Sequence, residues 1–267
     1  MSTDGPLLLE ERNHILIATI NRPDVHNALN AAVVAELRDA VVAAAANTNT
    51  RAVVVTGAGE KAFSAGADLR ELASMTADEA HETMRTGQQA FRQIEQAEIP
   101  VIAAVNGIAL GGGFELALAT TFPVLSARAS LGLPESSLGL IPGYGGTQRL
   151  PRAIGSRAAL HVMLTGERLS AARAHTLGLT PIEPVEADEL LPTALIIAEK
   201  ISRQGPKAVR SILHAVDRGT DSTLDAGAAL ETGLAALAVA SDESAEGISA
   251  FLEKRSAQFE AGETNDA

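Results

Sequence analysis

Short apolar runs alternate with helix-like segments through the first half of the chain, and this alternation most constrains its fold. The strand-like runs are rich in Val, Ile and Ala and stop at Pro or Gly, as buried strands do. They span 14–23, 51–59 and 99–107. The helix-like segments, 30–47 and 76–97, begin at the N-cap residues Asn30 and Thr76, and Glu79 completes a capping box. Strands that alternate with helices favour parallel pairing with crossover helices.

Helical patterns dominate the second half of the chain. A short helix after a glycine run, and then one or two short strands, are expected over 112–134. From about residue 143 nearly every segment has helical composition, and Gly205 and Pro206 interrupt this pattern near residue 200. We therefore expect an α/β core over 1–200 and a helical C-terminal region over 201–267.

The composition excludes several classes of function. The 267 residues, 46% of them hydrophobic, suffice for one large core. A net charge of −12 and an aromatic content of 3% argue against nucleic-acid binding, because phosphates are repelled and bases find few stacking partners. With no cysteine and no metal-ligand spacing among the six histidines, neither disulfides nor a metal site are expected. No apolar run approaches the roughly 18 residues of a membrane span, and the N-terminus lacks signal-peptide features, so we expect a cytoplasmic protein without membrane contacts.

Two familiar motifs are approached but not met. The run "GAGEKA" at 57–62 follows a strand and has the G-x-G-x-x-A form of a dinucleotide site. That site requires a helix to begin at the glycines, whereas Phe63, Ser64 and Gly66 follow here, which disfavours it. "AFSAG" around Ser64 is close to a hydrolase nucleophile elbow, yet its first residue is Ala62 and no histidine has an obvious Asp partner.

Two loops with few functional side chains carry a stronger signal. They are "FSAGADL" at 63–69 and "ALGGGFEL" at 109–116, and each runs into a helical segment. A glycine-rich loop is often only a turn, but three consecutive glycines cost stability that a turn does not require. At a helix start the backbone N–H groups are unpaired and lie at the positive end of the helix dipole. One N–H from each loop can therefore bind a single carbonyl oxygen, as an oxyanion hole does.

Two carboxylates lie within otherwise apolar surroundings. Glu115 follows the glycines of the second loop, and Glu135 follows Pro134 in "LGLPESSLGLIPG". Each is consistent with a charge that only complements a helix dipole, and each is also consistent with a catalytic acid or base of raised pKa. Because the two acids occur together with the glycine loops, the combination favours acid–base chemistry on a carbonyl compound.

Several stretches together resemble the enoyl-CoA hydratase/isomerase, or crotonase, family, from about residue 8 to residue 260. They are "INRPDVHNALN", "VVVTGAGEKAFSAGADLREL", "IPVIAAVNGIALGGGFELALA", "LGLPESSLGLIPGYGGTQRLPRAIG" and "EGISAFLEKRSAQF". The resemblance implies a crotonase-like spiral of ββα units with a helical C-terminal region. It also implies an enzyme that binds acyl thioesters of coenzyme A, with the thioester oxygen between the N–H groups of Ala67 and Gly112.

The resemblance further implies a hydratase that adds water across the 2,3 double bond of a 2-trans-enoyl-CoA to give a 3-hydroxyacyl-CoA. Hydratases of the family use two glutamates, which match Glu115 and Glu135. By this match Glu115 is the base towards water and Glu135 the acid towards Cα. Gly143 matches a glycine whose N–H positions the water or the substrate. No cofactor is implied besides the coenzyme A that belongs to the substrate.

Contacts to coenzyme A, and an oligomer, are also implied. The expected coenzyme A residues are Arg22, Ala65, Asp68, Arg70 and Lys254. Each of the basic ones, taken alone, is more often a solvated surface charge. Members of the family form trimers that pair as hexamers, with the C-terminal helices at the contacts, so a homo-trimer or homo-hexamer is expected. The resemblance also implies a role in β-oxidation, as part of fatty acid metabolism.

Three positions depart from the hydratase pattern. Phe114 stands where many hydratases have Cys, Thr121 where many have Asp, and Leu133 where many have Gln. Because Phe114 and Leu133 flank the two acids in sequence, the acyl pocket is expected to differ. A Δ3,Δ2-enoyl-CoA isomerase, which needs a single proton shuttle, and a non-catalytic acyl-CoA binding protein are the alternatives.

Overall fold

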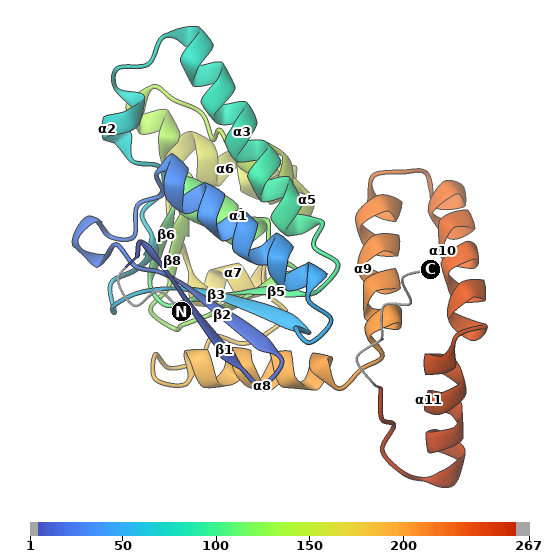
Figure 1. The fold of residues 1–267 in the computed structure, drawn as a ribbon. Helices are drawn as coiled ribbons and strands as arrows, with labels where there is room; N and C mark the ends of the chain where they lie inside the picture. The colour runs from blue at the N-terminus through green and yellow to red at the C-terminus, as the bar shows by residue number, and fades with distance from the viewer. Residues whose placement is uncertain (1–4, 260–267) are drawn as a thin grey trace.

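The computed structural model describes residues 5–259 and has an α/β fold built on two sheets (Figure 1). The larger sheet has the strand order β1-β2-β3-β5-β7. Its strands are β1 (Leu7–Arg12), β2 (Ile15–Ile20), β3 (Ala52–Gly57), β5 (Val101–Val105) and β7 (Phe122–Leu125). The smaller sheet has the order β4-β6-β8-β9. Its strands are β4 (Ala62–Ser64), β6 (Ile108–Leu110), β8 (Ser130–Gly132) and β9 (Leu169–Ser170).

Consecutive strands alternate between the two sheets before the chain turns into a helix. β3 and β4 precede α2 (Leu69–Leu72) and α3 (Ala77–Glu95), and β5 and β6 precede α4 (Gly112–Leu118). β7 and β8 precede a short 3-10 helix, η2 (Glu135–Leu138), and then α5 (Gly146–Ile154). Strands of successive repeats pair in parallel, whereas the outermost strands β1 and β9 pair antiparallel. This arrangement confirms the α/β class and the predicted spiral of ββα units.

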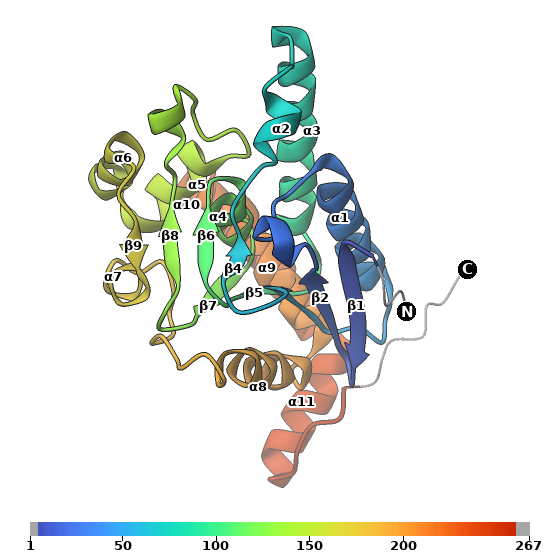
Figure 2. The ribbon, with the colours of Figure 1, turned by 90° about the vertical axis from the view of Figure 1, so that its left-hand side faces the viewer.

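The larger sheet has an apolar core on each face, because successive side chains of a strand point to opposite sides. Val53 and Val55 of β3 belong to the core beneath α1 (Ala31–Ala46) and α3. Val54, between them, belongs to a second core that α8 (Leu190–Ser202) covers, as Figure 2 shows. Burying one valine fully contributes about 1.5–3 kcal/mol, so both faces stabilise the larger sheet.

Local sequence signals set most of the remaining boundaries. The Asn30 side chain accepts a hydrogen bond from the Val33 N–H at 2.9 Å and caps α1, and Thr76 with Glu79 forms the expected capping box of α3. Strand β1 was not predicted, because its sequence, "LLLEER", ends in charged residues and most of it is exposed at the sheet edge. α6 (Ser156–Thr165) and α7 (Ala171–Thr176) follow α5 and lie beside β9 (Figure 2).

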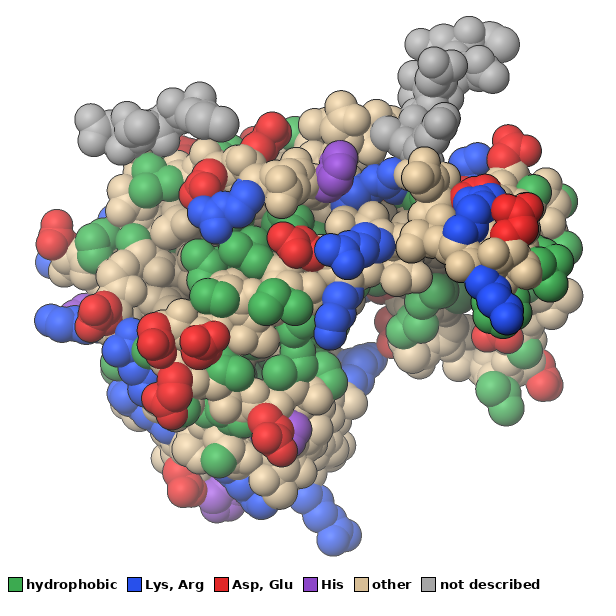
Figure 3. Space-filling view, turned by 90° about the horizontal axis from the view of Figure 1, so that it is seen from below, with side chains coloured by type: hydrophobic (Ala, Val, Ile, Leu, Met, Phe, Trp, Pro, Cys, Tyr) green, Lys and Arg blue, Asp and Glu red, His purple; other side chains and the backbone are tan. Residues whose placement is uncertain are grey.

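The last three helices form a lobe beside the α/β body, which we call the C-terminal lobe (Figures 1 and 3). They are α9 (Pro206–Thr220), α10 (Leu224–Val239) and α11 (Asp242–Glu253). None of the side chains of α9 and α10 is buried, and α11 buries only Ala250. Large apolar side chains are exposed instead, including Ile212, Val216, Leu237, Val239, Phe251 and Leu252. Exposed apolar surface of this extent is typical of an interaction surface.

The break between body and lobe lies between α8, which ends at Ser202, and α9, which begins at Pro206. The predicted boundary at residue 200 falls in the last turn of α8. Within residues 5–259 no single helix is long and apolar enough to cross a membrane, and only α10 and α11 taken together, bent by 69°, reach that length and composition.

Candidate active site

The two glycine-rich loops lie against each other at one edge of the smaller sheet. A Cβ atom placed on Gly66 would lie 3.2 Å from the nitrogen of Gly112, and one placed on Gly112 would lie 3.4 Å from the nitrogen of Ala67. The amides of Ala67 and Gly112, predicted to act together, are therefore close neighbours. Among the hydrogen bonds of the described chain, neither of these two N–H groups has an acceptor.

Local backbone geometry explains why Ala67 keeps its N–H free. The carbonyl of Gly66 accepts from the Leu29 N–H at 2.8 Å, and the Asp68 N–H donates to the Leu29 carbonyl at 3.0 Å. These two bonds secure the chain on either side of Ala67. Gly66 has φ +100°, and a Cβ there would lie 2.7 Å from the Leu110 carbonyl oxygen, so only glycine permits this approach of the loops.

Glu115 lies in the first turn of α4 and is 2% exposed. Its Oε1 accepts hydrogen bonds from the N–H groups of Tyr144, at 2.8 Å, and Gly146, at 2.7 Å. Burial raises the pKa of Glu115, while these amides and the positive charge of Arg149 act in the opposite direction. The carboxylate is thus held at the start of α5, where the positive end of a helix dipole favours a negative charge.

Glu135 is the first residue of η2 and lies beside the second glycine loop. A Cβ placed on Gly111 would be 3.0 Å from the Oε1 atom of Glu135. Its Oε2 is buried and has no hydrogen-bond partner among residues 5–259. Burial raises the pKa of Glu135 to about 7, and the negative charge of Glu115 adds to that rise. Near neutral pH this carboxyl therefore holds a proton for much of the time.

The arrangement supplies three different groups within one small region. Ala67 and Gly112 offer two free N–H donors, Glu115 offers a firmly held proton acceptor, and Glu135 offers a carboxyl that can donate a proton. Two carboxyls whose surroundings differ in this way suit separate acid and base roles in a reaction near neutral pH. Two neighbouring N–H donors suit an oxygen that gains negative charge.

The turn at residues 143–146 holds Glu115 by amides that the sequence did not assign to it. Gly143 was predicted to position the water or the substrate by its N–H, and that contact stays a prediction; its amide acts on the Glu115 carboxylate. Its carbonyl accepts from the Gln88 side chain at 2.8 Å. Tyr144 and Gly146, which donate the close hydrogen bonds to Glu115, were missed. The glycines of "PGYGGT" before a helical segment were the available signal, since they place free N–H groups at a helix start.

Tyr144 also contributes a wall to the region. Its ring meets the ring of Phe91 edge-on, with centroids 5.2 Å apart. A Cβ on Gly112 would lie 3.3 Å from a ring carbon of Tyr144, and a Cβ on Gly87 of α3 would overlap the ring. The ring therefore fills the space between α3 and the loop that carries Gly112.

Three of the predicted coenzyme A residues gather next to the first loop. Arg22 donates to the Ala28 carbonyl at 2.6 Å and to the Asp68 carboxylate at 3.4 Å. The Ala65 N–H donates to the His26 carbonyl at 2.9 Å. Arg22 and Asp68 thus hold the loop in place, while the exposed surface of Ala65 is open to a ligand.

The other two coenzyme A candidates, Arg70 and Lys254, lie apart from one another. Arg70 lies in α2, where its N–H donates to the capping carboxylate of Asp68, and its own side chain is exposed. Lys254 is exposed at the end of α11, and in Figures 1 and 2 α11 and α2 lie at opposite ends of the molecule. A single chain does not bring Lys254 to the loop, so its contact with coenzyme A stays a prediction.

The positions that depart from the hydratase pattern are packed inside the body. Phe114 and Leu133 are fully buried. A Cβ on Gly146 would be 3.0 Å from both a Leu133 methyl and the Glu115 Oε1, so Leu133 adds apolar surroundings to that carboxylate. The Thr121 hydroxyl accepts from the Val101 N–H at 3.0 Å and has a structural role at the start of β5.

The two disfavoured motifs also have structural explanations. The glycines of "GAGEKA" lead into strand β4 and not into a helix. The sequence predicted that no helix begins there, which a dinucleotide fingerprint would require. The Ser64 hydroxyl is buried and accepts from the Gly66 N–H at 3.2 Å, which shapes the first loop.

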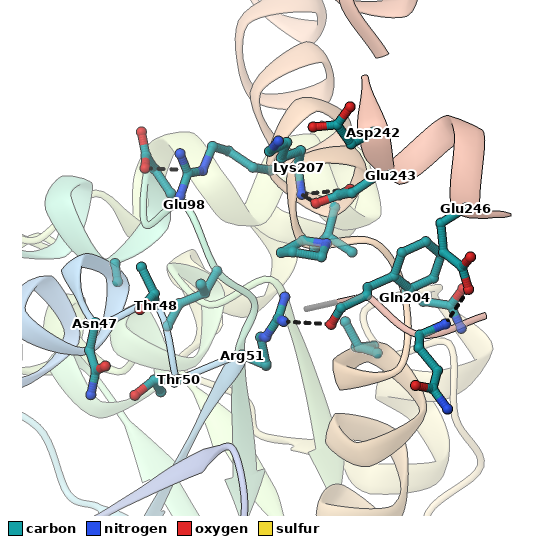
Figure 4. Close-up of a pocket in the computed structure, with 18 of the residues that line it drawn as sticks. Asn47, Thr48, Thr50, Arg51, Glu98, Gln204, Lys207, Asp242, Glu243 and Glu246 are labelled. Atoms are coloured by element: carbon teal, nitrogen blue, oxygen red, sulfur yellow. Dashed lines mark hydrogen bonds and ion pairs between the residues drawn. The ribbon is translucent and has the colours of Figure 1, made fainter. Parts of the chain in front are cut away.

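A cavity of about 1030 Å³ lies between the body and the C-terminal lobe (Figure 4). Arg51 donates to the Phe259 carbonyl there at 3.3 Å, and Arg210 pairs with Glu98 at 3.2 Å. The carboxylate of Glu243 accepts from the first amides of α9. None of the predicted site residues lines this cavity, so it is separate from the two glutamates.

Known proteins with similar sequences and structures identify the family of this chain. A family model described as enoyl-CoA hydratase/isomerase matches residues 10–262. A crotonyl-CoA hydratase of Syntrophomonas wolfei is 41% identical over 95% of this chain and 97% of its own length. A short-chain-enoyl-CoA hydratase of Clostridium acetobutylicum is 38% identical over 93% of this chain and 95% of its own length.

A solved structure extends the likeness to the fold. The crystal structure of an enoyl-CoA hydratase from Bacillus anthracis superposes with a TM-score of 0.93 at 39% identity, and the match covers 97% of this chain and 100% of that one. The chain therefore belongs to the enoyl-CoA hydratase/isomerase family, the crotonase family, as an enzyme of its enoyl-CoA hydratase type.

Proposed function

We propose that the chain hydrates a 2-trans-enoyl-CoA to the 3-hydroxyacyl-CoA, with Ala67, Gly112, Glu115 and Glu135 as the catalytic groups. The observation that carries the proposal is that two N–H groups without an acceptor among residues 5–259 lie close to two carboxyls with different surroundings. The names of the hydratase relatives support the reaction class.

In the proposed reaction the thioester oxygen lies between the N–H groups of Ala67 and Gly112. Glu115, ionised, takes a proton from water as the water oxygen bonds to Cβ, and negative charge moves to the thioester oxygen. Glu135, protonated, then gives its proton to Cα as the enolate collapses to the product. One water is consumed, and the proton taken by Glu115 balances the one that Glu135 gives. A proton then passes from Glu115 to Glu135, directly or through solvent, and restores both groups for the next turnover. The two carboxyls alone move the protons, so the proposed reaction requires no cofactor beyond the coenzyme A of the substrate.

The structure favours hydration over a double-bond shift. An isomerase needs one group that removes a proton and returns it, and a second buried acid would then serve no purpose. Burying Glu115 and the Oε2 of Glu135 also costs free energy that a non-catalytic binding protein has no reason to spend. The two-acid reaction is therefore the function that accounts for both side chains.

We also propose that coenzyme A contacts the first loop at Ala65, with Arg22, Asp68 and Arg70 close by. The exposed apolar side chains of the C-terminal lobe support assembly into a homo-trimer or a pair of trimers. In such an assembly Lys254 of one subunit would approach the coenzyme A of another, which accounts for its distance from the loop within one chain.

The test is an assay with crotonyl-CoA, followed by the loss of the enoyl absorbance and by identification of the product. Formation of 3-hydroxybutyryl-CoA is the expected result. Conversion of a 3-enoyl-CoA to the 2-enoyl-CoA without hydration would establish the isomerase instead. Tight binding of crotonyl-CoA in calorimetry with no change in either compound would establish a binding protein.

A further inference from the structure

The turn that holds Glu115 is itself held from behind by an arginine. The Tyr144 N–H donates to Glu115, while the Tyr144 carbonyl accepts from the Nη1 of Arg149 at 2.8 Å. Gly145, between the two donors to Glu115, has φ +107°, and a Cβ there would overlap the Arg149 guanidinium. The guanidinium is therefore seated directly against the turn.

Arg149 is the first member of a chain of ion pairs that crosses three helices. Its Nε and Nη2 each donate to one oxygen of Glu95 on α3, both at 2.9 Å. Arg92, on the same helix, donates to Glu95 at 2.7 Å. Arg92 also binds both carboxylate oxygens of Asp217 on α9, at 2.6 and 3.0 Å. The chain of contacts thus joins the turn at Glu115 to the C-terminal lobe.

This ion-pair chain is better protected from water than the pair of Arg85 and Glu82 on α3. The side chains of Arg149, Asp217, Glu95 and Arg92 are 15%, 18%, 26% and 35% exposed, whereas those of Arg85 and Glu82 are 50% and 60% exposed. Exposed pairs contribute little, but forked arginine–carboxylate pairs with low exposure fix geometry strongly. The hydrogen bonds and charges of Arg149 and Arg92 lower the pKa of Glu95 in spite of its burial.

We propose that Arg149 and Glu95 are positioning residues for the base Glu115, and that Asp217 extends this support into the C-terminal lobe. This inference rests on the proposed function, because it takes Glu115 to be the base. Arg149 fixes the Tyr144 carbonyl on the far side of the turn, so that the N–H groups of residues 144 and 146 stay directed at the carboxylate.

The charge of Arg149 has a second effect. Three titratable groups face Glu115: Arg149 of α5, Glu135 of η2, and Tyr144. The neighbouring strands β4, β6 and β7 contain no titratable residue. Arg149 is the one cation among the three, and it lowers the pKa of Glu115 against the effect of burial. Removing its charge should therefore raise the pKa of Glu115 and move the acid limb of the rate profile to higher pH.

The experiment compares five single variants across pH, with kcat and KM for crotonyl-CoA as readouts. We expect Arg149→Met to lower kcat by about 10²-fold, the scale of acid–base catalysis, with KM changed less than threefold and the acid limb shifted upward. Arg149→Lys should keep the acid limb near its original pH and recover only part of kcat, since lysine keeps the charge but loses the fork. Glu95→Gln should lower kcat by about tenfold, and Asp217→Asn less. Glu82→Gln makes the same kind of change at the exposed ion pair of α3, and it should alter neither kcat nor the pH of the acid limb.

The result that overturns the proposal is a folded Arg149→Met variant with an unchanged kcat and acid limb, or a folded Arg149→Lys variant with an unchanged kcat, even if its melting temperature falls. If Arg149→Met does not fold, Arg149→Lys and Glu95→Gln decide. If the unaltered protein hydrates no enoyl-CoA, the proposed function fails on its own. The ion-pair chain is then judged by infrared titration of the Glu115 carboxyl, identified by Glu115→Gln: an unshifted titration in Arg149→Met, which removes the charge, refutes it.

Discussion

At the scale of single residues, Glu135 shows most clearly how surroundings set chemistry. Its carboxyl lies beside Gly111, one of its oxygens is buried without a hydrogen-bond partner in the part of the chain that the structure describes, and its pKa is raised to about 7. Glu115 is more deeply buried yet has two backbone N–H donors. The hydrogen bonds, more than the burial, therefore distinguish the proposed acid from the proposed base.

A stability measurement tests the surroundings of Glu135 independently of activity. Its pKa rises from 4.5 to about 7 on folding, so the folded state loses stability as pH increases through that interval and the carboxyl ionises. Glu135→Gln carries no such charge. We expect its melting temperature to exceed that of the parent at pH 8, with the difference shrinking as the pH falls towards 4.5. A difference that stays constant between pH 5 and pH 8 would contradict the raised pKa.

Gly112 tests the shared oxygen site. A Cβ there would lie 3.3 Å from the Tyr144 ring and 3.4 Å from the Ala67 nitrogen, so the methyls of Gly112→Val would occupy the space between the two amides. We expect kcat/KM for crotonyl-CoA to fall by at least about 10²-fold, as when one oxyanion donor is removed. Circular dichroism shows whether the variant is folded. A folded variant that hydrates crotonyl-CoA at the parent rate would mean that the thioester oxygen does not bind between these two amides.

Sequence reasoning singled out the two glycine loops, Glu115 and Glu135, because glycine runs and isolated acids are visible in the sequence. The choice of Ala67 and Gly112 within those loops came from the resemblance to the crotonase family. It could not reach Tyr144, whose importance comes from contacts with α3 that are distant in sequence. The same holds for Arg149 and Glu95, which look like ordinary surface charges until folding brings them together.

At the scale of elements, α3 shapes the site from outside it. Gly87, in its interior, leaves room for the Tyr144 ring, and Glu95 at its end binds Arg149. The helix itself was predictable from its capping box, and so were β3, β5, α1 and α4 from their apolar patterns. Strand β1 was not, because an exposed edge strand lacks the apolar run on which prediction depends.

Two glycine-to-alanine changes separate packing from helix propensity. In an exposed helix interior this change stabilises by about 0.5–1 kcal/mol, which is the expectation for Gly233 of α10, where a Cβ meets no atom within 4 Å. At Gly87 a Cβ overlaps Tyr144, and overpacking of this kind costs about 1–3 kcal/mol. We expect urea unfolding to show Gly233→Ala as more stable than the parent, and Gly87→Ala as less stable and less active. Equal stabilisation of both variants would mean that the ring moves freely.

At the scale of the whole molecule, the C-terminal lobe departs most from a self-sufficient fold. Its helices were predictable from composition, and the resemblance to the crotonase family gave the spiral. Neither of these predicted the position of the lobe beside the body or the apolar side chains on its surface. No local sequence pattern tells which face of a helix remains uncovered.

The lobe is expected to join copies of the chain. Light scattering should give the mass of a trimer or a hexamer, because the exposed apolar side chains of α9 and α10 need a partner. Val216→Asp, on the exposed face of α9, should reduce the measured mass of the assembly. The control Leu160→Asp, on the body, should leave that mass unchanged. A monomeric mass for the unaltered protein would refute the assembly.

The most direct test of the account measures the rate of crotonyl-CoA hydration by Glu115→Gln and Glu135→Gln beside the parent protein. Both variants keep the shape of the side chain and the two amides, so binding of a saturated acyl-CoA should change little. The account predicts that each variant lowers kcat by at least about 10²-fold, the usual scale for loss of an acid or a base. Hydration at the parent rate by both variants would contradict it.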